Sequence, residues 1–586
     1  MTAPLPLRPS PAERPGLRRA AFFLTCLAIG LGLSALAWRV LAPDGWTGWE
    51  VALMAAWLGT LPWTCLCAGN ALFGFVLGLA RRDPVASVVP GWQRHPVLPP
   101  RARTAIAVCL RNESMAAVLP PLARLLDGLE ATLGPAAAAR GFTLWLLSDT
   151  QDPVAAAAED AAIARFAAER DDRGIALHHR RRALNTGFKA GNVMDFLDGP
   201  GRGFDFFLCL DADSEMSAAA VLRLVATMQA EPRLAILQQL IVGRPADSAF
   251  TRLFQFGMRA GMRSWATGQA WWQLDQGPYW GHNALIRVAP FRAHARLEPL
   301  ADGRAILSHD QIEAVRLHAA GWKVRCVPEE AGSQEGNPPS LPDFLTRDRR
   351  WGAGNMQYFS LLRLPGLTAM GRWQLVQAIL LFLSAPLWLL VMLAAIGNAV
   401  SGGGEGTPPA ALAALLIANW AAIHAPKLLS YLALLLRPRR AAPYGGPMAV
   451  ARGAAAEILF TTLLDPVSLA SKAIFLAGLA CGRRIGWAPQ NRDAHGLAWR
   501  DAARLLWPET LLGLAGLATL AAAGGTAWAW GLPFLAPLVL AAPFAVLTAS
   551  PGFSRWMRNA RLCATPEELA PERVPVAVRE PALAAG

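Results

Sequence analysis

Long apolar runs, each about the length of a lipid bilayer, constrain this chain more than any other feature. A helix that crosses the hydrocarbon core needs about 20 mostly apolar residues. Such runs lie towards both ends of the 586-residue sequence, on either side of a polar stretch at roughly 100–370. The runs are 20–42, 51–80, 375–400, 410–436, 505–523 and 526–550. The sequence therefore predicts an integral membrane protein with one large polar domain.

The basic residues predict on which side of the membrane that domain lies, because Lys and Arg concentrate in cytoplasmic flanks. Arg18 and Arg19 precede the first run, and Arg81 and Arg82 follow the second. The connectors 43–50 and 401–409 contain neither Lys nor Arg. We expect three hairpins that reach outward, with both termini and the polar domain in the cytoplasm. This placement also accounts for much of the net charge of +13, so no nucleic-acid partner is expected.

A further apolar segment, residues 454–482, does not fit this pattern. Arg452 precedes it and Arg483 follows it, so a single crossing would place basic residues on opposite faces of the membrane. Asp465-Pro466 also interrupts its middle. We interpret the segment as one or two amphipathic helices at the cytoplasmic interface. The alternative is eight spans, with this segment and another each split.

These boundaries divide the chain into seven parts. They are a cytoplasmic tail (1–19), a transmembrane hairpin (20–82), the cytoplasmic polar domain (83–372), a second hairpin (373–440), interfacial helices (441–503), a third hairpin (504–550) and a C-terminal tail (551–586). The tail contains much Pro, Ala and Glu and is expected to be disordered. The eight cysteines form no CxxC pair, so a structural zinc or iron–sulfur site is not expected.

Within the polar domain, short apolar runs alternate with helical stretches rich in Ala and Leu. Strands are expected at 104–110, 142–147, 175–178, 204–210 and 234–239, and helices at 154–168, 221–229 and 311–320. Continuous apolar strands joined by crossover helices predict a parallel sheet covered on both faces. Such sheets bind ligands beyond the carboxyl ends of their strands. The absence of a P-loop or a GxGxxG turn at a strand–helix junction argues against ATP-driven transport and dinucleotide redox chemistry.

Two acidic motifs are candidates for chemistry. Asp211-Ala212-Asp213 follows a strand, and carboxylates at i and i+2 can turn toward one hard cation such as Mg²⁺ or Mn²⁺. That cation would leave room for the phosphates of a nucleotide, although a solvated turn is the plain alternative. Asp310 could act as a general base, but Ser308 or Asp310 would equally serve as a helix N-cap.

Basic and aromatic residues complete the candidate site. The run 347–351 (RDRRW) offers forked donors for phosphate and a flat ring for a sugar; a membrane flank would explain its Arg residues but not the Trp. Lys189, between glycines, could approach a pyrophosphate, whereas the basic run at 178–182 is expected to be mostly solvated. Five aromatic residues could line an acceptor channel or rest on the membrane interface: Trp265, Trp271, Trp272, Tyr279 and Trp280.

These residues, in this order and between these membrane pairs, resemble the processive membrane glycosyltransferases of family 2, which include cellulose, hyaluronan and chitin synthases. Asp149 matches the first donor-site Asp of that family, and Asp211 and Asp213 match its DxD motif. Asp310 matches the base of its TED motif, and 347–351 takes the place of QxxRW. The variants SHD and RDRRW, with the strings TGFKAGN, YWGHNALIR and GSQEGNPPSLPDF, are similar to one branch. That branch makes osmoregulated periplasmic glucans in Gram-negative bacteria, and the resemblance covers about residues 20–550.

The resemblance implies a cytoplasmic GT-A-type, Rossmann-like α/β domain inserted between transmembrane helices of the inner membrane. It implies UDP-glucose as donor, a growing glucan, typically β-1,2-linked, as acceptor, and Mg²⁺ or Mn²⁺ held by Asp211 and Asp213. Asp310 is then the catalytic base of an inverting, processive reaction. We expect donor contacts from Asn112, Glu113, Asp149, Lys189, Asp211, Arg347 and Arg350, and acceptor contacts from Trp280, His282, Asn283 and Trp351. The bilayer and a periplasmic glucan-processing protein are the further candidate partners.

A hydroxyl-rich polymer cannot cross hydrocarbon unaided, because each unpaired polar group costs several kcal/mol. We therefore hypothesise that synthesis is coupled to export, with Asn419 and His424 among the residues that line a polar channel. Two other functions remain open at this point. One is a non-processive glycosyltransferase with a lipid acceptor, and the other is a transporter with a nucleotide-sensing domain.

Overall fold

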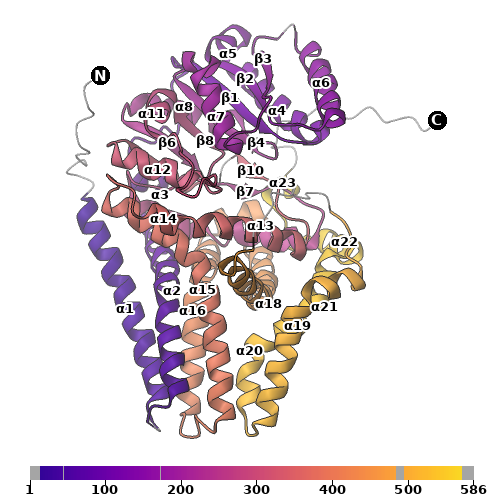
Figure 1. The fold of residues 1–586 in the computed structure, drawn as a ribbon. Helices are drawn as coiled ribbons and strands as arrows, with labels where there is room; N and C mark the ends of the chain where they lie inside the picture. Colours follow the sequence, from indigo (N-terminus) through magenta and orange to yellow (C-terminus); the bar gives the residue numbers. More distant parts are fainter. Residues whose placement is uncertain (1–13, 44, 172, 331, 484–493, 571–586) are drawn as a thin grey trace.

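The computed structural model describes residues 14–43, 45–171, 173–330, 332–483 and 494–570. An α/β domain lies on one end of a bundle of long apolar helices, and shorter helices fill the layer between them (Figure 1). This is the predicted architecture, an α/β domain inserted between membrane helices.

The large sheet of the α/β domain has the strand order β3-β2-β1-β4-β8-β6-β9. Its strands are β1 (Thr104–Leu110), β2 (Phe142–Ser148), β3 (Ala176–Arg181), β4 (Phe206–Asp211), β6 (Leu234–Gln239), β8 (Ala284–Arg287) and β9 (Lys323–Val327). All five predicted strands are confirmed. The all-parallel sheet is wrong, because β8 runs antiparallel to β4 and β6. The chain reaches β8 at the carboxyl end of β4, where Ala284 faces Cys209, and so has to run back.

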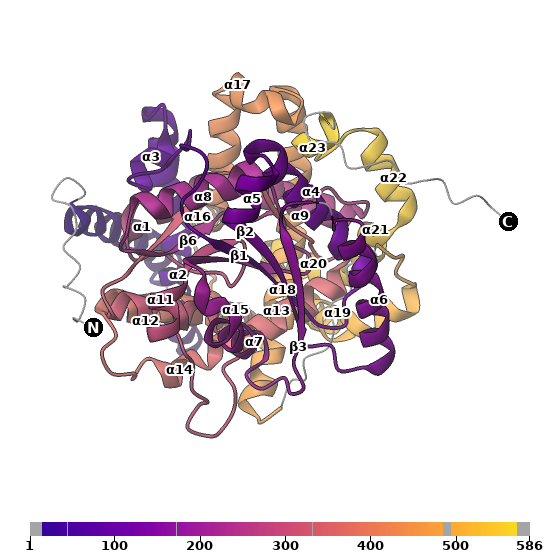
Figure 2. The ribbon, with the colours of Figure 1, turned by 90° about the horizontal axis from the view of Figure 1, so that it is seen from above.

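Alternating residues of the central strands face two different cores. Ile106 and Val108 of β1 pack with α4 (Met115–Leu133), α6 (Pro153–Ala168) and α8 (Ala218–Ala230). Ala105 and Ala107 pack on the opposite face, with α7 (Phe188–Asp198), α11 (Val288–His294) and α12 (Asp310–Ala319). A central strand buried on both faces explains why its sequence is continuously apolar. Figure 2 shows the sheet from above, crossing over the helix bundle.

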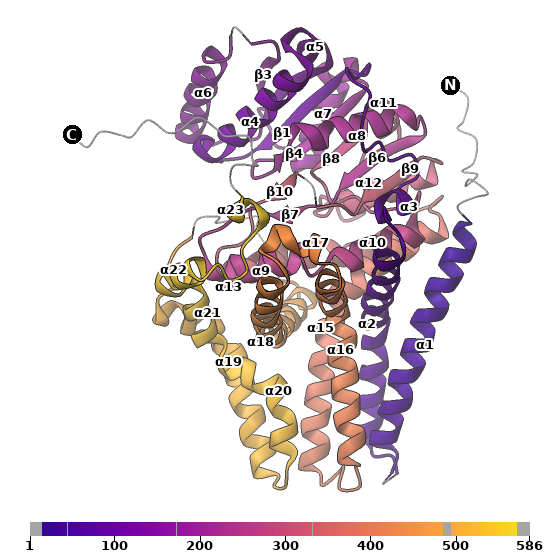
Figure 3. The same ribbon diagram turned by 180° about the vertical axis from the view of Figure 1, so that it is seen from behind.

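A second, small sheet lies between the large sheet and the membrane helices. Its strand order is β5-β10-β7, from β5 (Glu215–Met216), β10 (Ser333–Glu335) and β7 (Val242–Gly243). Below it lie α9 (Ala249–Arg259), α10 (Arg263–Gln273) and α13 (Leu341–Met356), as Figure 3 shows from behind. β5 begins two residues after Asp213, and Gly336, the residue after β10, lies next to the Asp213 side chain, so this sheet forms the floor under the DxD motif.

Six described helices are long and apolar enough to cross a membrane: α1 (Pro15–Leu41), α2 (Gly48–Ala80), α15 (Ala369–Val400), α16 (Pro409–Leu435), α18 (Pro447–Ala480) and α19 (Trp499–Ala522). The predicted span 526–550 is a pair, α20 (Ala527–Val539) and α21 (Ala541–Ala549), bent by 49°. Five predicted spans therefore coincide with single helices, and the sixth is a broken one.

Helix α18 covers the segment that we placed at the interface. It is one continuous helix through Pro466, so the expected interruption at that proline is wrong. Figures 1 and 3, which face opposite sides, both show α18 nearly end-on, whereas α15 and α16 are seen along their length. The helix thus crosses beneath the α/β domain at an angle to its neighbours. Its length and composition would also allow a span, so the interfacial placement remains a prediction.

The α/β domain is fixed to the membrane helices by the contact between α2 and α10. A Cβ atom on Gly74 would lie 1.7 Å from the Ser264 carbonyl oxygen, and one on Gly268 would lie 1.9 Å from that of Asn70. Small residues permit such close approach of two backbones. Beside them, Trp272 donates to Asn70 Oδ1 (2.8 Å) and stacks on Phe22 at a centroid distance of 4.4 Å.

The C-terminal tail departs from the predicted disorder. Residues 551–570 form α22 (Pro551–Asn559) and α23 (Pro566–Leu569), and the chain between them folds back over α9. Glu567 and Glu568 pair with the buried Arg259 and Arg252 of α9. A composition that looks unstructured is ordered here because its acidic residues compensate two buried cations. Residues 571–586 lie outside the described part.

Candidate active site

Three strand ends bring the candidate donor residues to one edge of the sheet. Strands β1, β2 and β4 are parallel and in register, so Leu110 faces Ser148 and Cys109 faces Asp211. Asn112, Asp149 and Asp211 therefore lie at the same edge of the sheet. The half-buried Glu113 follows Asn112 in the turn before α4.

Asp149 is held by an arginine that the sequence analysis missed. Arg182 Nε and Nη2 donate to the two carboxylate oxygens at 2.7 and 2.8 Å, and both side chains are only 7% exposed. Arg182 also donates to the carbonyls of Thr186 and Phe188. The basic run around it predicted a solvated position, but Arg182 is buried. The one feature of the sequence that could have indicated this role is the position of Arg182, directly after β3 at the same edge of the sheet.

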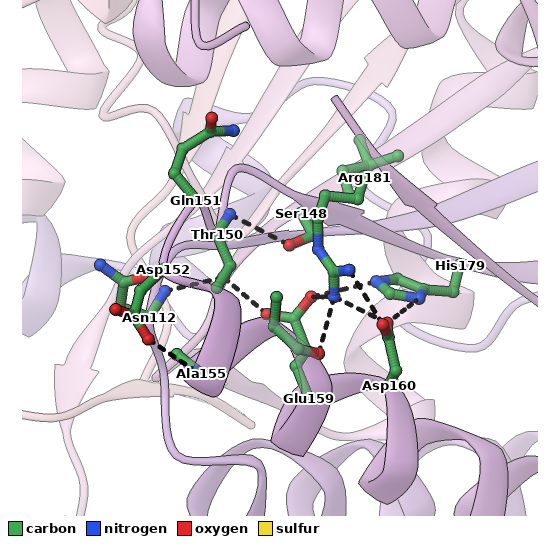
Figure 4. Close-up of polar contacts among 12 residues, drawn as sticks. Asn112, Ser148, Thr150, Gln151, Asp152, Ala155, Glu159, Asp160, His179 and Arg181 are labelled. Atoms are coloured by element: carbon green, nitrogen blue, oxygen red, sulfur yellow. Dashed lines mark hydrogen bonds and ion pairs between the residues drawn. The ribbon is translucent and has the colours of Figure 1, made fainter. Parts of the chain in front are cut away.

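A polar network supports this edge from the side (Figure 4). The backbone N–H of Asn112 donates to Thr150 Oγ1 at 2.9 Å, and Thr150 donates to the buried Glu159 at 2.7 Å. Burial opposes the negative charge on Glu159, but hydrogen bonds from His179, Ser148, Thr150 and Arg181 outweigh it and lower its pKa to about 2. Glu159 thus remains an anionic anchor for the Asn112 turn.

The same network contains a group with metal-like spacing. Ligand atoms of Glu159, Asp160 and His179 lie within 4.8 Å of one another. Arg181 already pairs with both carboxylates, at 3.0 Å to Glu159 and 2.7 Å to Asp160. An internal cation therefore balances these charges, and we interpret the group as structural.

Lys189 and the first Asp of the DxD motif form the centre of the site. Lys189 Nζ donates to Asp211 Oδ1 and to the carbonyl oxygen of Gly281 (2.8 Å). Burial opposes the charge on Lys189, but Asp211 outweighs it and raises the lysine pKa. The other Asp211 oxygen lies 3.5 Å from His282 Nδ1. Lys189 therefore remains cationic beside the carboxylates that would meet a diphosphate.

Glu335, on β10, is a second residue that the sequence analysis did not single out. Its Oε2 lies 3.0 Å from His282 Nε2, so the imidazole lies between Glu335 and Asp211. Burial raises the pKa of Glu335; the charges of His282 and Arg347 oppose this rise, and those of Asp213 and Asp211 add to it. Asp213 also lies by Gly336, where an added Cβ would be 3.5 Å from Asp213 Oδ2. The string GSQEGNPPSLPDF contained this Glu, but nothing in it revealed the partner.

Asp310 lies beside Gly281, the glycine whose carbonyl oxygen accepts from Lys189. A Cβ on Gly281, whose φ is +85°, would be 3.5 Å from Asp310 Cβ and 3.9 Å from Asp310 Oδ2. The preceding His309 bonds Glu313 at 2.9 Å. Burial opposes the charge on His309, but Glu313 raises its pKa to about 9. The candidate base is thus next to Gly281, whose carbonyl holds Lys189, with a cationic imidazolium beside it.

The 347–351 run lies on α13, beneath the small sheet. The Arg347 guanidinium is buried, 3.5 Å from Asn337 Oδ1 and 4.7 Å from the centroid of Trp351. Arg350 is also buried, whereas Trp351 is 49% exposed. Asp348 pairs with Lys472 of α18 at 3.0 Å. The run therefore does more than flank a membrane span, because it joins the active-site floor to α18.

The predicted acceptor patch divides into parts. Trp271 stacks on Phe73 of α2, Trp272 on Phe22 of α1, and Tyr279 is buried in the domain core. Trp265 and Trp280 pack together with Leu240 and Val242 near β7. Asn283 is completely buried, and its Nδ2 donates to Ser333 Oγ (3.0 Å) and the Gln334 carbonyl (3.2 Å). These contacts make Asn283 a support of β10 rather than a surface for a sugar.

The chemistry of these donors fits a hard divalent cation. Asp211 and Asp213 supply oxygen ligands, as Mg²⁺ and Mn²⁺ prefer. His282 turns Nδ1 toward Asp211 while a carboxylate holds Nε2, the arrangement typical of a metal-binding histidine. The carboxylates of Asp211, Asp213 and Glu335 gather around His282 and Gly336, where added positive charge would be favourable.

The fold and these residues define a family 2 glycosyltransferase, and the model of the glycosyl transferase family group 2 matches residues 206–432. The glucans biosynthesis glucosyltransferase H of Xanthomonas euvesicatoria pv. vesicatoria (strain 85-10) is 32% identical, over 96% of this chain and 89% of that protein. The protein of the same name from Caulobacter vibrioides (strain NA1000 / CB15N) is also 32% identical, over 95% and 86%. The chain belongs to this family of glucan-synthesising glucosyltransferases.

Among solved structures, the chain is similar to the mannosyltransferase PcManGT from Pyrobaculum calidifontis, in complex with GDP-Man and Mn²⁺. The two share 15% identity with a TM-score of 0.43, over 66% of this chain and 98% of that one.

Proposed function

We propose that the protein polymerises glucose from UDP-glucose into a glucan, processively and with inversion at the anomeric carbon, and that it passes the product across the membrane. The backbone would be β-1,2-linked, as is typical of the branch it resembles. One observation carries the proposal. Gly281 joins the donor side, through Lys189 and Asp211, to the candidate base Asp310.

The donor would lie across the carboxyl edge of the sheet. Asp149, held by Arg182, would accept from the nucleobase, beside the turns of Asn112 and Glu113. The diphosphate would meet Lys189 near Asp211 and Asp213, with Arg347 and Arg350 contributing positive charge from below. Mg²⁺ or Mn²⁺ bound by Asp211, Asp213 and His282 would neutralise the charge of the departing UDP. We therefore assign His282 to the donor side of the site rather than to the acceptor.

Asp310 would remove the proton from the acceptor hydroxyl as its oxygen attacks the anomeric carbon from the face opposite UDP. The C–O bond to UDP breaks as the new glycosidic bond forms, so the configuration inverts without a covalent enzyme intermediate. General base catalysis is typically worth about 10²–10⁴-fold in rate. The exposed ring of Trp351 and the half-buried Trp280 are the surfaces on which the acceptor sugars would stack.

Export would begin at α13, which links the site to the membrane helices. Beyond it, polar side chains gather between α16 and α18: Lys427 and Tyr431 bond the fully buried Glu457, and His424 Nε2 lies 3.6 Å from Asp465. Asn419 and His424 of α16 are buried as well. Buried polar groups in apolar helices are costly and mark functional routes. We place the glucan path along this interface.

The test uses purified protein with Mg²⁺ or Mn²⁺ and a panel of UDP-sugars, followed by product sizing and linkage analysis. We expect long β-glucan from UDP-glucose alone. A single sugar on lipid would instead identify a non-processive transferase, and no consumption of any UDP-sugar would leave the transporter alternative. In sealed vesicles, glucan should appear on the side opposite the donor; product confined to the donor side would contradict export.

A further inference from the structure

The C-terminal segment, residues 551–570, returns from the last membrane helix to the active-site floor. Its Glu567 pairs with Arg259, which is 2% exposed, at 2.7 Å (Nη1 to Oε2) and 2.9 Å (Nη2 to Oε1). Arg259 Nε also donates to Glu330 at 2.6 Å, just before β10. A buried guanidinium with two carboxylate partners forms a rigid junction.

From this junction, two routes lead to Glu335. In the first, Glu567 Oε1 accepts from Gln334 Nε2 at 2.8 Å, and Gln334 is the chain neighbour of Glu335. In the second, Arg259 donates to the carbonyl oxygen of Gly243 at 3.2 Å. Gly243 faces Glu335 in the small sheet, and the next residue, Arg244, donates its N–H to the Glu335 carbonyl at 3.0 Å. Glu567 therefore contacts β10 directly through Gln334, and β7 indirectly through Arg259.

Glu335 in turn orients His282. Its Oε2 lies 3.0 Å from Nε2 of that ring, and Nδ1 of the ring lies 3.5 Å from Asp211. When a carboxylate fixes one ring nitrogen, the ring orientation and the other nitrogen are fixed as well. A displacement of β10 would thus turn the imidazole away from the DxD motif.

We propose that Glu567 is a positioning residue for the donor site: it holds β10 so that Glu335 keeps His282 directed at Asp211. This inference rests on the proposed function of that site as the place where the cation and donor bind. The C-terminal segment, which follows the membrane helices, would thus stabilise the donor site, although it lies more than 200 residues after β10 in the chain.

The neighbouring Glu568 provides a matched control. It too pairs with a buried arginine of α9, at 2.6 Å from Arg252, which is 1% exposed. The other described side-chain bond of Arg252, to the Leu562 carbonyl, stays within the C-terminal segment. Glu568→Ala therefore removes the same kind of buried pair from the same helix, without touching Gln334 or Gly243.

The first measurement is hydrogen–deuterium exchange of β10 in the full-length protein in detergent. Glu567→Ala should speed exchange of residues 333–335 roughly 5-fold, as for the loss of one hydrogen bond, and Glu568→Ala should leave it within 2-fold of wild type. Equal exchange in the two variants would overturn the inference. If Glu567→Ala does not fold, Gln334→Ala removes one route only, and unchanged exchange of β10 there counts against the inference equally.

The second measurement is Mn²⁺ binding by electron paramagnetic resonance, without donor. Glu335→Gln should weaken binding about 10-fold or more, as is usual for a partner of a metal-binding histidine. Glu567→Ala should weaken it roughly 5-fold alone and by less than 2-fold in the Glu335→Gln background, since the two act through one path. Additive losses would refute that path. A wild-type protein that binds no Mn²⁺ would contradict the proposed donor site, and the exchange comparison would then decide the inference.

Discussion

Replacement of Arg182 by methionine should loosen the donor edge more than any other single change there. Among the described residues, the side chain makes five hydrogen bonds: two to Asp149, one to Asp195 and two to the carbonyls of Thr186 and Phe188. Arg182→Met keeps most of the apolar stem and removes all five. It leaves the Asp149 carboxylate, 7% exposed, without the cation that holds it.

The burial of this ion pair allows the loss in free energy of unfolding to be estimated. Removal of one member of a buried ion pair costs about 3–5 kcal/mol. Asp149→Asn should cost less, about 1–3 kcal/mol, because Arg182 keeps Asp195 and two carbonyls as partners. The double variant should cost no more than Arg182→Met alone, since the unpaired carboxylate is then gone.

Hydrogen–deuterium exchange of residues 182–192 measures this opening locally, as exchange reports the free energy of local unfolding. A cost of about 3 kcal/mol corresponds to roughly 100-fold faster exchange, and binding of a fluorescent UDP analogue should weaken in parallel. The control is Arg173→Met, whose pair with Asp127 is about half exposed and should be worth less than about 1 kcal/mol. Unchanged exchange in Arg182→Met, or additive losses in the double variant, would refute this reasoning.

Asp310→Asn should abolish nearly all glucan synthesis, by about 10²-fold or more, while UDP still binds in a calorimetric titration; a variant that still synthesises glucan would reject Asp310 as base. Burial opposes the charge on His309, but Glu313 raises its pKa from 6.5 to about 9, so its stabilising contribution is complete below pH 6.5 and is lost as pH rises through 9. His309→Gln should flatten that alkaline decline in melting temperature, and an unaltered profile would exclude His309 as its source. Gly268→Val should prevent close packing of α10 on α2 and sharply lower the yield of folded protein, whereas Gly203→Val, with open space where a Cβ would lie, should be tolerated. Trp351→Ala should shorten the product more than it slows UDP release, which chain sizing and a UDP assay distinguish.

The sequence was sufficient for features that depend on local pattern. Apolar runs of bilayer length predicted the membrane helices, and short buried strands predicted the α/β domain, because burial imposes its own composition on each segment. The predicted strands and helix also end or begin next to Asp149, Asp211 and Asp310, as the structure has them. Parallel strands bring their carboxyl ends to one edge, so the sequence alone predicts where the candidate site lies.

Only the tertiary structure decided which polar groups meet. Arg182 and its basic neighbours look alike in sequence, yet Arg182 is buried on Asp149, while Arg181 is partly exposed and pairs with Glu159 and Asp160. His282 and Glu335 are 53 residues apart, and Gln334 and Glu567 are 233 apart. Such contacts depend on how distant segments pack, and the sequence around one charged residue does not indicate which residue it will contact. The antiparallel orientation of β8 and the ordered C-terminal segment were not predicted for the same reason, since each is stabilised by contacts with remote parts of the chain.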